Sequence, residues 1–100
     1  MAKHDFAALF GQYPAVVNQM DERFTSHKFI LELARQNQQL YVEALYDYRD
    51  GTPFQAVHQR LADLLNDCHL VERDGIERHS HDIWGNEQEC SRWRKVRRTT

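Results

Sequence analysis

The sequence predicts a mainly α fold, and three observations support that prediction. Only two prolines and four glycines interrupt 100 residues, which favours long helices over a fold with many turns. Apolar residues recur at the helical period along most of the chain. A Gly-Thr-Pro sequence at residues 51–53 separates two amphipathic segments, so two helices joined by a short turn are expected at the centre.

Length and composition predict one small helical domain with four parts. Hydrophobic residues make up 41% and charged residues 28% of the chain, enough for one core. The expected parts are helical support at 1–24, a helix-turn-helix-like core at 25–66, a hairpin or loop at 67–85 and a basic helix at 86–100. No apolar run reaches the length of a membrane span, and the first residues lack the apolar core of a signal peptide. We therefore expect a cytoplasmic protein without a membrane partner.

The first segment predicts a broken helix. Asp5 is a suitable N-cap for apolar residues that follow at helical spacing. Pro14 lacks a backbone donor, so we expect a break there, or a new helix with Pro14 in its first turn. Residues 21–23, Asp-Glu-Arg, are interpreted as an exposed connection.

The central segment predicts one long helix from Ser26 to Arg49. Thr25 or Ser26 can cap it, and its apolar stripe keeps one phase through Asn37. A bend at residues 36–39 is the alternative. The stripe consists of Ile30, Ala34, Tyr41, Leu45 and Tyr48.

The next segment predicts a helix from Phe54 to Asn66 and then a short hairpin. Gly51 can end the preceding helix, Thr52 can cap the new one, and Pro53 suits its first position. The surface opposite its apolar stripe carries Gln55, Gln59, Asp63 and Asn66. Farther on, Asp74-Gly75 is a hairpin turn signal, so residues 70–73 are expected to pair with residues just after Ile76.

The last segment is interpreted as a helix, with a strand as the open alternative. Asn86 is a suitable N-cap, acidic residues follow it, and basic residues lie at the end, which complements a helix dipole. Cys90, Trp93 and Val96 recur every third residue. Trp93 is expected in the core rather than on the surface as a stacking platform.

The central helices suggest a function through a family resemblance. Two helices joined by a short turn can place the second in a DNA major groove. Residues 58–65, followed by Leu-Val-Glu-Arg-Asp-Gly at 70–75, resemble the recognition helix, strand and wing of winged-helix DNA-binding regulators over residues 38–96. The resemblance implies base contacts from the helix and backbone contacts from the wing. The family has two helices of moderate length before the recognition helix, where this sequence predicts one.

Specific residues follow as candidates for nucleic-acid binding. The amides of Gln55 and Gln59 suit adenine, and Arg60 suits guanine or a phosphate. Five cations without an acid among them form a basic cluster that suits phosphates. The cluster consists of Arg92, Arg94, Lys95, Arg97 and Arg98.

The charge distribution keeps a second function open. Residues 63–89 hold eight acids and only two basic residues, Arg73 and Arg78. Those acids would repel phosphates. A protein-interaction adaptor or inhibitor, anchored by tyrosine and tryptophan, is therefore the alternative to a regulator that binds DNA, and a homodimer would favour the regulator.

No cofactor, metal or catalytic site is expected. Two cysteines do not form a disulfide framework, and both are expected as free thiols, with Cys90 the better candidate for burial. Cys68, His79, His81 and Cys90 are zinc-binding residue types, but their spacing fits no finger motif. Nothing in the sequence positions a nucleophile beside His79 and His81, so a non-enzymatic protein is predicted.

Overall fold

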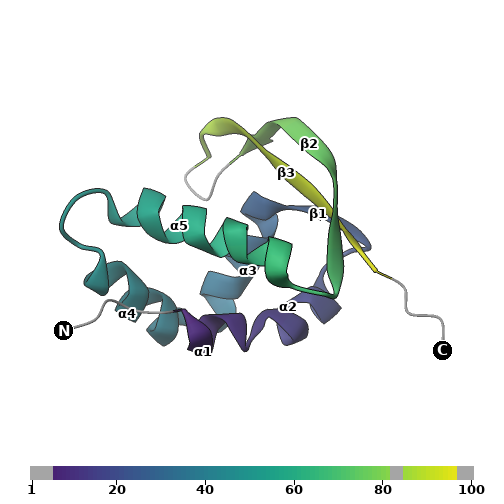
Figure 1. Ribbon diagram of the computed structural model, residues 1–100. Helices are drawn as coiled ribbons and strands as arrows, with labels where there is room; N and C mark the ends of the chain where they lie inside the picture. The colour runs from purple at the N-terminus through teal and green to yellow at the C-terminus, as the bar shows by residue number, and fades with distance from the viewer. Residues whose placement is uncertain (1–5, 82–84, 97–100) are drawn as a thin grey trace.

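The computed structural model describes residues 6–81 and 85–96, which form an α+β fold (Figure 1). Two short helices, α1 (Ala7–Phe10) and α2 (Tyr13–Gln19), precede strand β1 (Arg23–Thr25). Helices α3 (Ser26–Gln36), α4 (Gln38–Asp47) and α5 (Pro53–Leu64) follow, and a 3-10 turn η1 (Leu65–Asp67) extends α5. Strands β2 (Val71–His81) and β3 (Glu87–Lys95) complete the fold.

The strands form a three-stranded antiparallel sheet in the order β1-β3-β2. The strand that is last in sequence therefore lies in the middle of the sheet. Phe24 of β1 lies opposite Trp93 of β3, and both side chains are buried. The sheet stands over the helices in Figure 1, with β2 and β3 extending as a long hairpin beyond the short β1.

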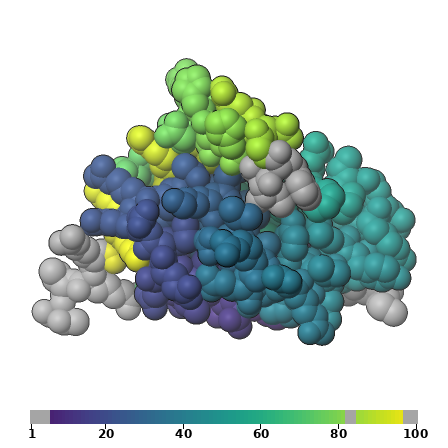
Figure 2. All heavy atoms as spheres, turned by 180° about the vertical axis from the view of Figure 1, so that it is seen from behind, coloured from purple at the N-terminus to yellow at the C-terminus, as the bar shows by residue number. Residues whose placement is uncertain are grey.

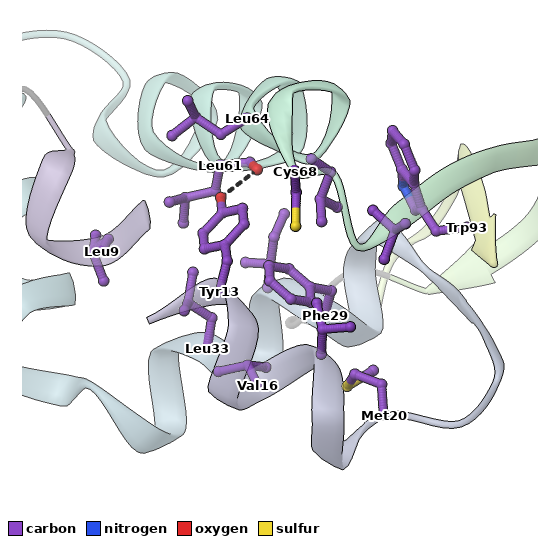
Figure 3. Close-up of a cluster of buried hydrophobic side chains, with 14 of the residues drawn as sticks. Leu9, Tyr13, Val16, Met20, Phe29, Leu33, Leu61, Leu64, Cys68 and Trp93 are labelled. Atoms are coloured by element: carbon purple, nitrogen blue, oxygen red, sulfur yellow. Dashed lines mark hydrogen bonds between the residues drawn. The ribbon is translucent and has the colours of Figure 1, made fainter. Parts of the chain in front are cut away.

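The core lies between the helices and the inner face of the sheet (Figure 3). Its largest fully buried side chains include Tyr13, Phe29, Leu33 and Leu61. The Tyr13 hydroxyl donates to the backbone carbonyl of Leu61 at 2.6 Å, which joins α2 to α5. One apolar cluster thus holds the helices and the sheet together.

Several local predictions are confirmed. Pro14 lies in the first turn of α2, and Pro53 begins α5. Gly51 does not end the preceding helix as predicted, because α4 ends at Asp47 with Tyr48 as its C-cap; Gly51 lies in the connection to α5 with a positive φ of 121°. Thr52 is the N-cap residue of α5, but its side chain makes no capping hydrogen bond. Thr25 caps α3 by accepting a hydrogen bond from the backbone N–H of Lys28. The predicted cap at Asp5 lies outside the described residues. The confirmed predictions depended on the local preferences of proline for the first helical turn and of threonine for the N-cap.

The predicted long helix from Ser26 to Arg49 is wrong, because it breaks at Asn37. This residue has φ −134° and ψ 51°, and its side-chain amide donates to the carbonyl of Leu33 at 3.1 Å. Asparagine side chains compete with backbone hydrogen bonds in this way. The break lies where the alternative placed a bend, and it leaves two helices of 11 and 10 residues before α5.

The predicted tight turn at Asp74-Gly75 is also wrong, because these residues form a bulge within β2. Arg73 pairs with Trp93 and Ile76 with Ser91, so two residues of β2 lie opposite Arg92 alone. Gly75 has a positive φ of 117° within this bulge, a conformation that favours glycine. The hairpin is therefore longer than predicted, and its second strand comes from beyond residue 86.

The mainly α prediction is wrong, and so is the C-terminal basic helix that formed part of it. Of the described residues, 53% are helical and 26% lie in strands. Trp93 of β3 is buried, Cys90 of β3 is half-buried, and Val96 just after the strand is exposed, so the spacing of three was not a helical face. Pairing with β1 and β2, which are distant in sequence, decides the conformation of this segment.

The segment interpreted as an exposed connection also contains part of the sheet, since Arg23 begins β1. None of the helices in the described part of the chain is long and apolar enough to cross a membrane.

Candidate functional site

Helix α5 and the β2–β3 hairpin enclose a groove of about 710 Å³, here called the α5–hairpin groove. Residues at the start of α3 also line it, and Figure 2 shows the hairpin as a ridge above the helices. Polar side chains dominate the lining. They include Gln55, Gln59 and Asp63 from α5, Asn66 from η1, His27 from α3, Arg73 from β2, and Gln88 and Glu89 from β3.

One face of α5, continued by η1, supplies four polar side chains of the groove. Gln55, Gln59, Asp63 and Asn66 are exposed and follow one another at intervals of four, four and three residues, while Val57 and Leu61 on the other face are buried. Packing of the apolar face therefore fixes which side chains line the α5–hairpin groove.

The amides differ in how they are held. The Gln59 side-chain N–H donates to a carboxylate oxygen of Asp63 at 2.9 Å, one helical turn away. Gln55 makes no side-chain hydrogen bond to any other residue of the described part, so its carboxamide is available to a ligand.

Arg60 lies outside the α5–hairpin groove, on the other flank of α5, and its side chain is exposed. Burial raises the pKa of Tyr13, and the Cys68 thiol raises it further. The positive charge of Arg60 is near enough to Tyr13 to lower that pKa in part. The structure thus separates Arg60 from the two glutamines with which it was predicted to act.

The described members of the basic cluster also lie apart from the α5–hairpin groove. Arg92 and Arg94 alternate along β3 with the buried Trp93, so they point to the outer face of the sheet. Arg94 forms an ion pair with Glu72, its cross-strand neighbour. Arg92 donates to the backbone carbonyl of Asp74 at 3.3 Å, and Lys95 donates to that of Asn18 at 3.4 Å.

Acids of β2 thus offset part of the positive charge of the basic cluster. Asp74 lies 3.3 Å from the Nε atom of Arg23, so the outer face carries three arginines, at 23, 92 and 94, around the carboxylates of Glu72 and Asp74. Arg97 and Arg98 lie outside the described residues. The predicted basic helix is replaced by a cross-strand charge network on the sheet.

Trp93 lies in the core, as expected. Its indole N–H donates to the Ser26 hydroxyl at 2.8 Å, and this hydroxyl donates in turn to the carbonyl of Ser91 at 3.4 Å. Only 3% of Trp93 is exposed, which leaves no ring face for stacking on a base. Its contact fixes the start of α3 against β3, where the α5–hairpin groove begins.

The histidines and cysteines do not gather into a site within the described residues. The Nδ1 atom of His79 lies 3.0 Å from a carboxylate oxygen of Glu87, and the Nδ1 atom of His27 in α3 lies 2.9 Å from the hydroxyl of Ser80. Among the residues that the structure describes, no group of three or more histidine, cysteine or acidic side chains could hold a metal ion. Both cysteines are free thiols, but Cys68 is the buried one and Cys90 is half-buried, the reverse of the expectation.

Sequence reasoning missed the second wall of the α5–hairpin groove. Gln88 and Glu89 come from a segment predicted as a helix, and Arg73 comes from a strand expected to turn two residues later. His27, at the start of α3, had no distinguishing spacing. Their side chains meet α5 only through sheet pairing over long sequence distances, which leaves no local pattern.

A comparison of the chain with protein-family models, curated proteins and solved structures finds no match.

Proposed function

We propose that the protein is a non-enzymatic DNA-binding module that places α5 and the β2–β3 hairpin against a duplex. The single observation that carries the proposal is the α5–hairpin groove. Its helical wall presents two carboxamides, Gln55 and Gln59, one turn apart, and its other wall is a hairpin. Carboxamides pair with adenine in the major groove, which an α-helix can enter.

The order of elements supports the proposal. The break at Asn37 yields two helices of moderate length before α5, the arrangement of winged-helix regulators that the sequence did not predict. The long hairpin that follows α5 corresponds to the strand and wing of that family. Fold alone does not establish function, so the residues of the α5–hairpin groove have to carry the test.

Cations around the groove would supply the affinity for phosphates. Arg60 extends from the free flank of α5, and Arg73 lines the groove from β2. Arg92 and Arg94 act from the outer face of the sheet, and Lys95 acts from the end of β3 near α2. Arg97 and Arg98 follow them in the sequence. Because several of these side chains are engaged with acids or carbonyls, moderate affinity at low salt is expected.

The test is fluorescence anisotropy of a mixed-sequence duplex titrated with the protein at about 50 and about 200 mM salt. We expect binding that weakens steeply with salt. Gln55→Ala combined with Gln59→Ala should raise Kd by about tenfold or more at low salt, since a good amide–base pair contributes about 1–3 kcal/mol. Gln39→Ala is the matched control, because Gln39 is an exposed glutamine on α4, away from the groove. Absence of binding at the lower salt would refute the proposal.

A protein partner is the second candidate, and the carboxylates of Asp63 and Glu89 in the α5–hairpin groove favour it. A duplex would meet these charges, whereas a basic peptide would be attracted to them. Under this alternative the protein binds no duplex at either salt concentration, and the double glutamine variant still loses its protein partner.

A further inference from the structure

Asp63 stands out on a surface proposed to bind DNA, because a carboxylate repels phosphates. It lines the α5–hairpin groove, and Gln59 holds it through a hydrogen bond of 2.9 Å. Asp67, one turn farther along, is equally exposed but does not line the groove. Helix geometry therefore assigns one of two neighbouring carboxylates to the candidate DNA surface.

Asp63 forms no ion pair within the described residues. No Lys, Arg or His of the described residues lies within ion-pair distance of it, although Arg73 lines the same groove. Its contact with Gln59 is a pair at i and i+4 on an exposed helical face, which stabilises a helix only slightly. Water therefore hydrates the exposed carboxylate in the unbound protein, and a ligand in the groove has to replace that hydration with hydrogen bonds of its own.

Together, the two side chains offer mainly hydrogen-bond acceptors. Gln59 uses one of its two amide N–H groups for Asp63 and keeps its carbonyl oxygen free to accept. The carboxylate of Asp63 adds two acceptor oxygens and no donor. The pair is therefore suited to a ligand group that donates hydrogen bonds.

In the major groove, such donors are the exocyclic amino groups of cytosine and adenine. Guanine and thymine present acceptors at the corresponding positions and would meet the carboxylate unfavourably. Adenine carries an acceptor beside its amino group, which suits a carboxamide, whereas the cytosine amino group suits a carboxylate. Cytosine is thus the base that Asp63 fits best, and adenine is the base that Gln55 fits best.

We propose that Asp63, held by Gln59, selects cytosine at one position of the DNA that the α5–hairpin groove binds. The inference rests on the proposed function and adds a specificity to it. It also gives a role to an acid that would otherwise only weaken binding to a polyanion. Asp63 excludes acceptor-bearing bases and so narrows the set of duplexes that bind.

The test is selection from a pool of duplexes with a random central block, at low salt, with the full chain. Wild type is compared with Asp63→Asn and with the matched control Asp67→Asn, which removes the same charge outside the α5–hairpin groove. Circular dichroism checks that both variants fold like the wild type. The enriched sequences give the base preference at each position.

We expect the wild type to enrich cytosine at one position. Asp63→Asn should lower the preference for cytosine over thymine there by about tenfold and shift it toward adenine, because asparagine pairs with adenine. Asp67→Asn should keep the cytosine.

Binding without an enriched cytosine, or a cytosine preference that survives Asp63→Asn, overturns the inference while leaving DNA binding intact. An equal loss of the preference in Asp67→Asn overturns it too, since charge alone would then explain the effect. If the wild type binds no member of the pool, the proposed function fails, and the inference fails with it.

Discussion

At the scale of single residues, Tyr13 is a polar group that the core accommodates. In a regular helix the backbone N–H of Leu65 would donate to the carbonyl of Leu61. Here that N–H donates to the carbonyl of Ala62, and the Tyr13 hydroxyl donates to the carbonyl of Leu61 in its place. The ring is completely buried and lies 4.7 Å from that of Phe29, centre to centre, in an edge-to-face arrangement. One side chain thus supplies both apolar packing and a hydrogen bond between α2 and α5.

Tyr13→Phe is expected to keep the packing and lose the hydrogen bond. The Leu61 carbonyl would then be buried without its partner, so the free energy of unfolding should fall by about 1–2 kcal/mol. Urea unfolding measures the change. Tyr46→Phe, at a tyrosine that is 62% exposed, is the control and should change stability by less than about 0.5 kcal/mol. Equal effects of the two substitutions would contradict a specific role for the Tyr13 hydroxyl.

At the scale of elements, the bulge at Asp74-Gly75 brings three parts of the sheet together. A Cβ atom on Gly75 would lie 2.9 Å from a guanidinium nitrogen of Arg92, and Arg92 donates to the carbonyl of Asp74. Arg23 reaches the carboxylate of the same aspartate. The positive φ therefore favours glycine at this position, and an added Cβ atom would also displace the end of the Arg92 side chain.

Gly75→Ala should destabilise the protein by about 1–3 kcal/mol, because its φ is unfavourable for residues with a Cβ atom. Gly51→Ala is a matched control for backbone strain, since Gly51 has a similar φ of 121° but nothing within 4 Å of an added Cβ atom. We expect Gly75→Ala to lower the free energy of unfolding more than Gly51→Ala does, because the added Cβ atom also displaces Arg92. Thermal unfolding of the two variants measures the difference. The reverse order would show that the contact with Arg92 is unimportant.

The same element shows how far the sequence could predict the fold. Asp74-Gly75 was predicted as the turn of a hairpin and instead lies within the first strand of one, because a local motif cannot distinguish a turn from a bulge. Whether Asp74-Gly75 forms a turn or a bulge depends on whether residues 76–81 pair with β3, some ten residues farther along. Likewise Gln55, Gln59 and Asp63 were correctly placed on the exposed face of a helix, whereas Gln88 and Glu89 could be found only by knowing the sheet register.

At the scale of the whole molecule, burial of tyrosine hydroxyls links stability to alkaline pH. Burial raises the pKa of Tyr13 far above its usual value of 10, and it raises that of Tyr41 as well. In the unfolded chain both hydroxyls lose their protons near pH 10. A folded-state pKa that is raised stabilises the fold below pH 10, and this contribution is lost as the pH rises above that value.

Urea unfolding at pH 8 and pH 11 tests this linkage. The wild type should lose more stability over the interval than Tyr13→Phe does, by about 1.4 kcal/mol for the one pH unit above 10. Lysine and cysteine ionisation affects both proteins alike and cancels in the comparison. Parallel pH profiles of the two proteins would mean that Tyr13 ionises as easily in the fold as in the unfolded chain.

The position of β3 in the middle of the sheet also has a consequence for how the molecule folds. The indole of Trp93 and the hydroxyl of Ser26 are 67 positions apart in the chain, and their contact helps to close the core. The helices can begin to form from neighbouring residues, but the sheet has to wait for this distant segment, and closing so large a loop costs conformational entropy. During synthesis, Phe24 and its neighbours therefore remain without their covering strand until residues 87–95 have left the ribosome, and in that interval the nascent chain would be most in need of a chaperone.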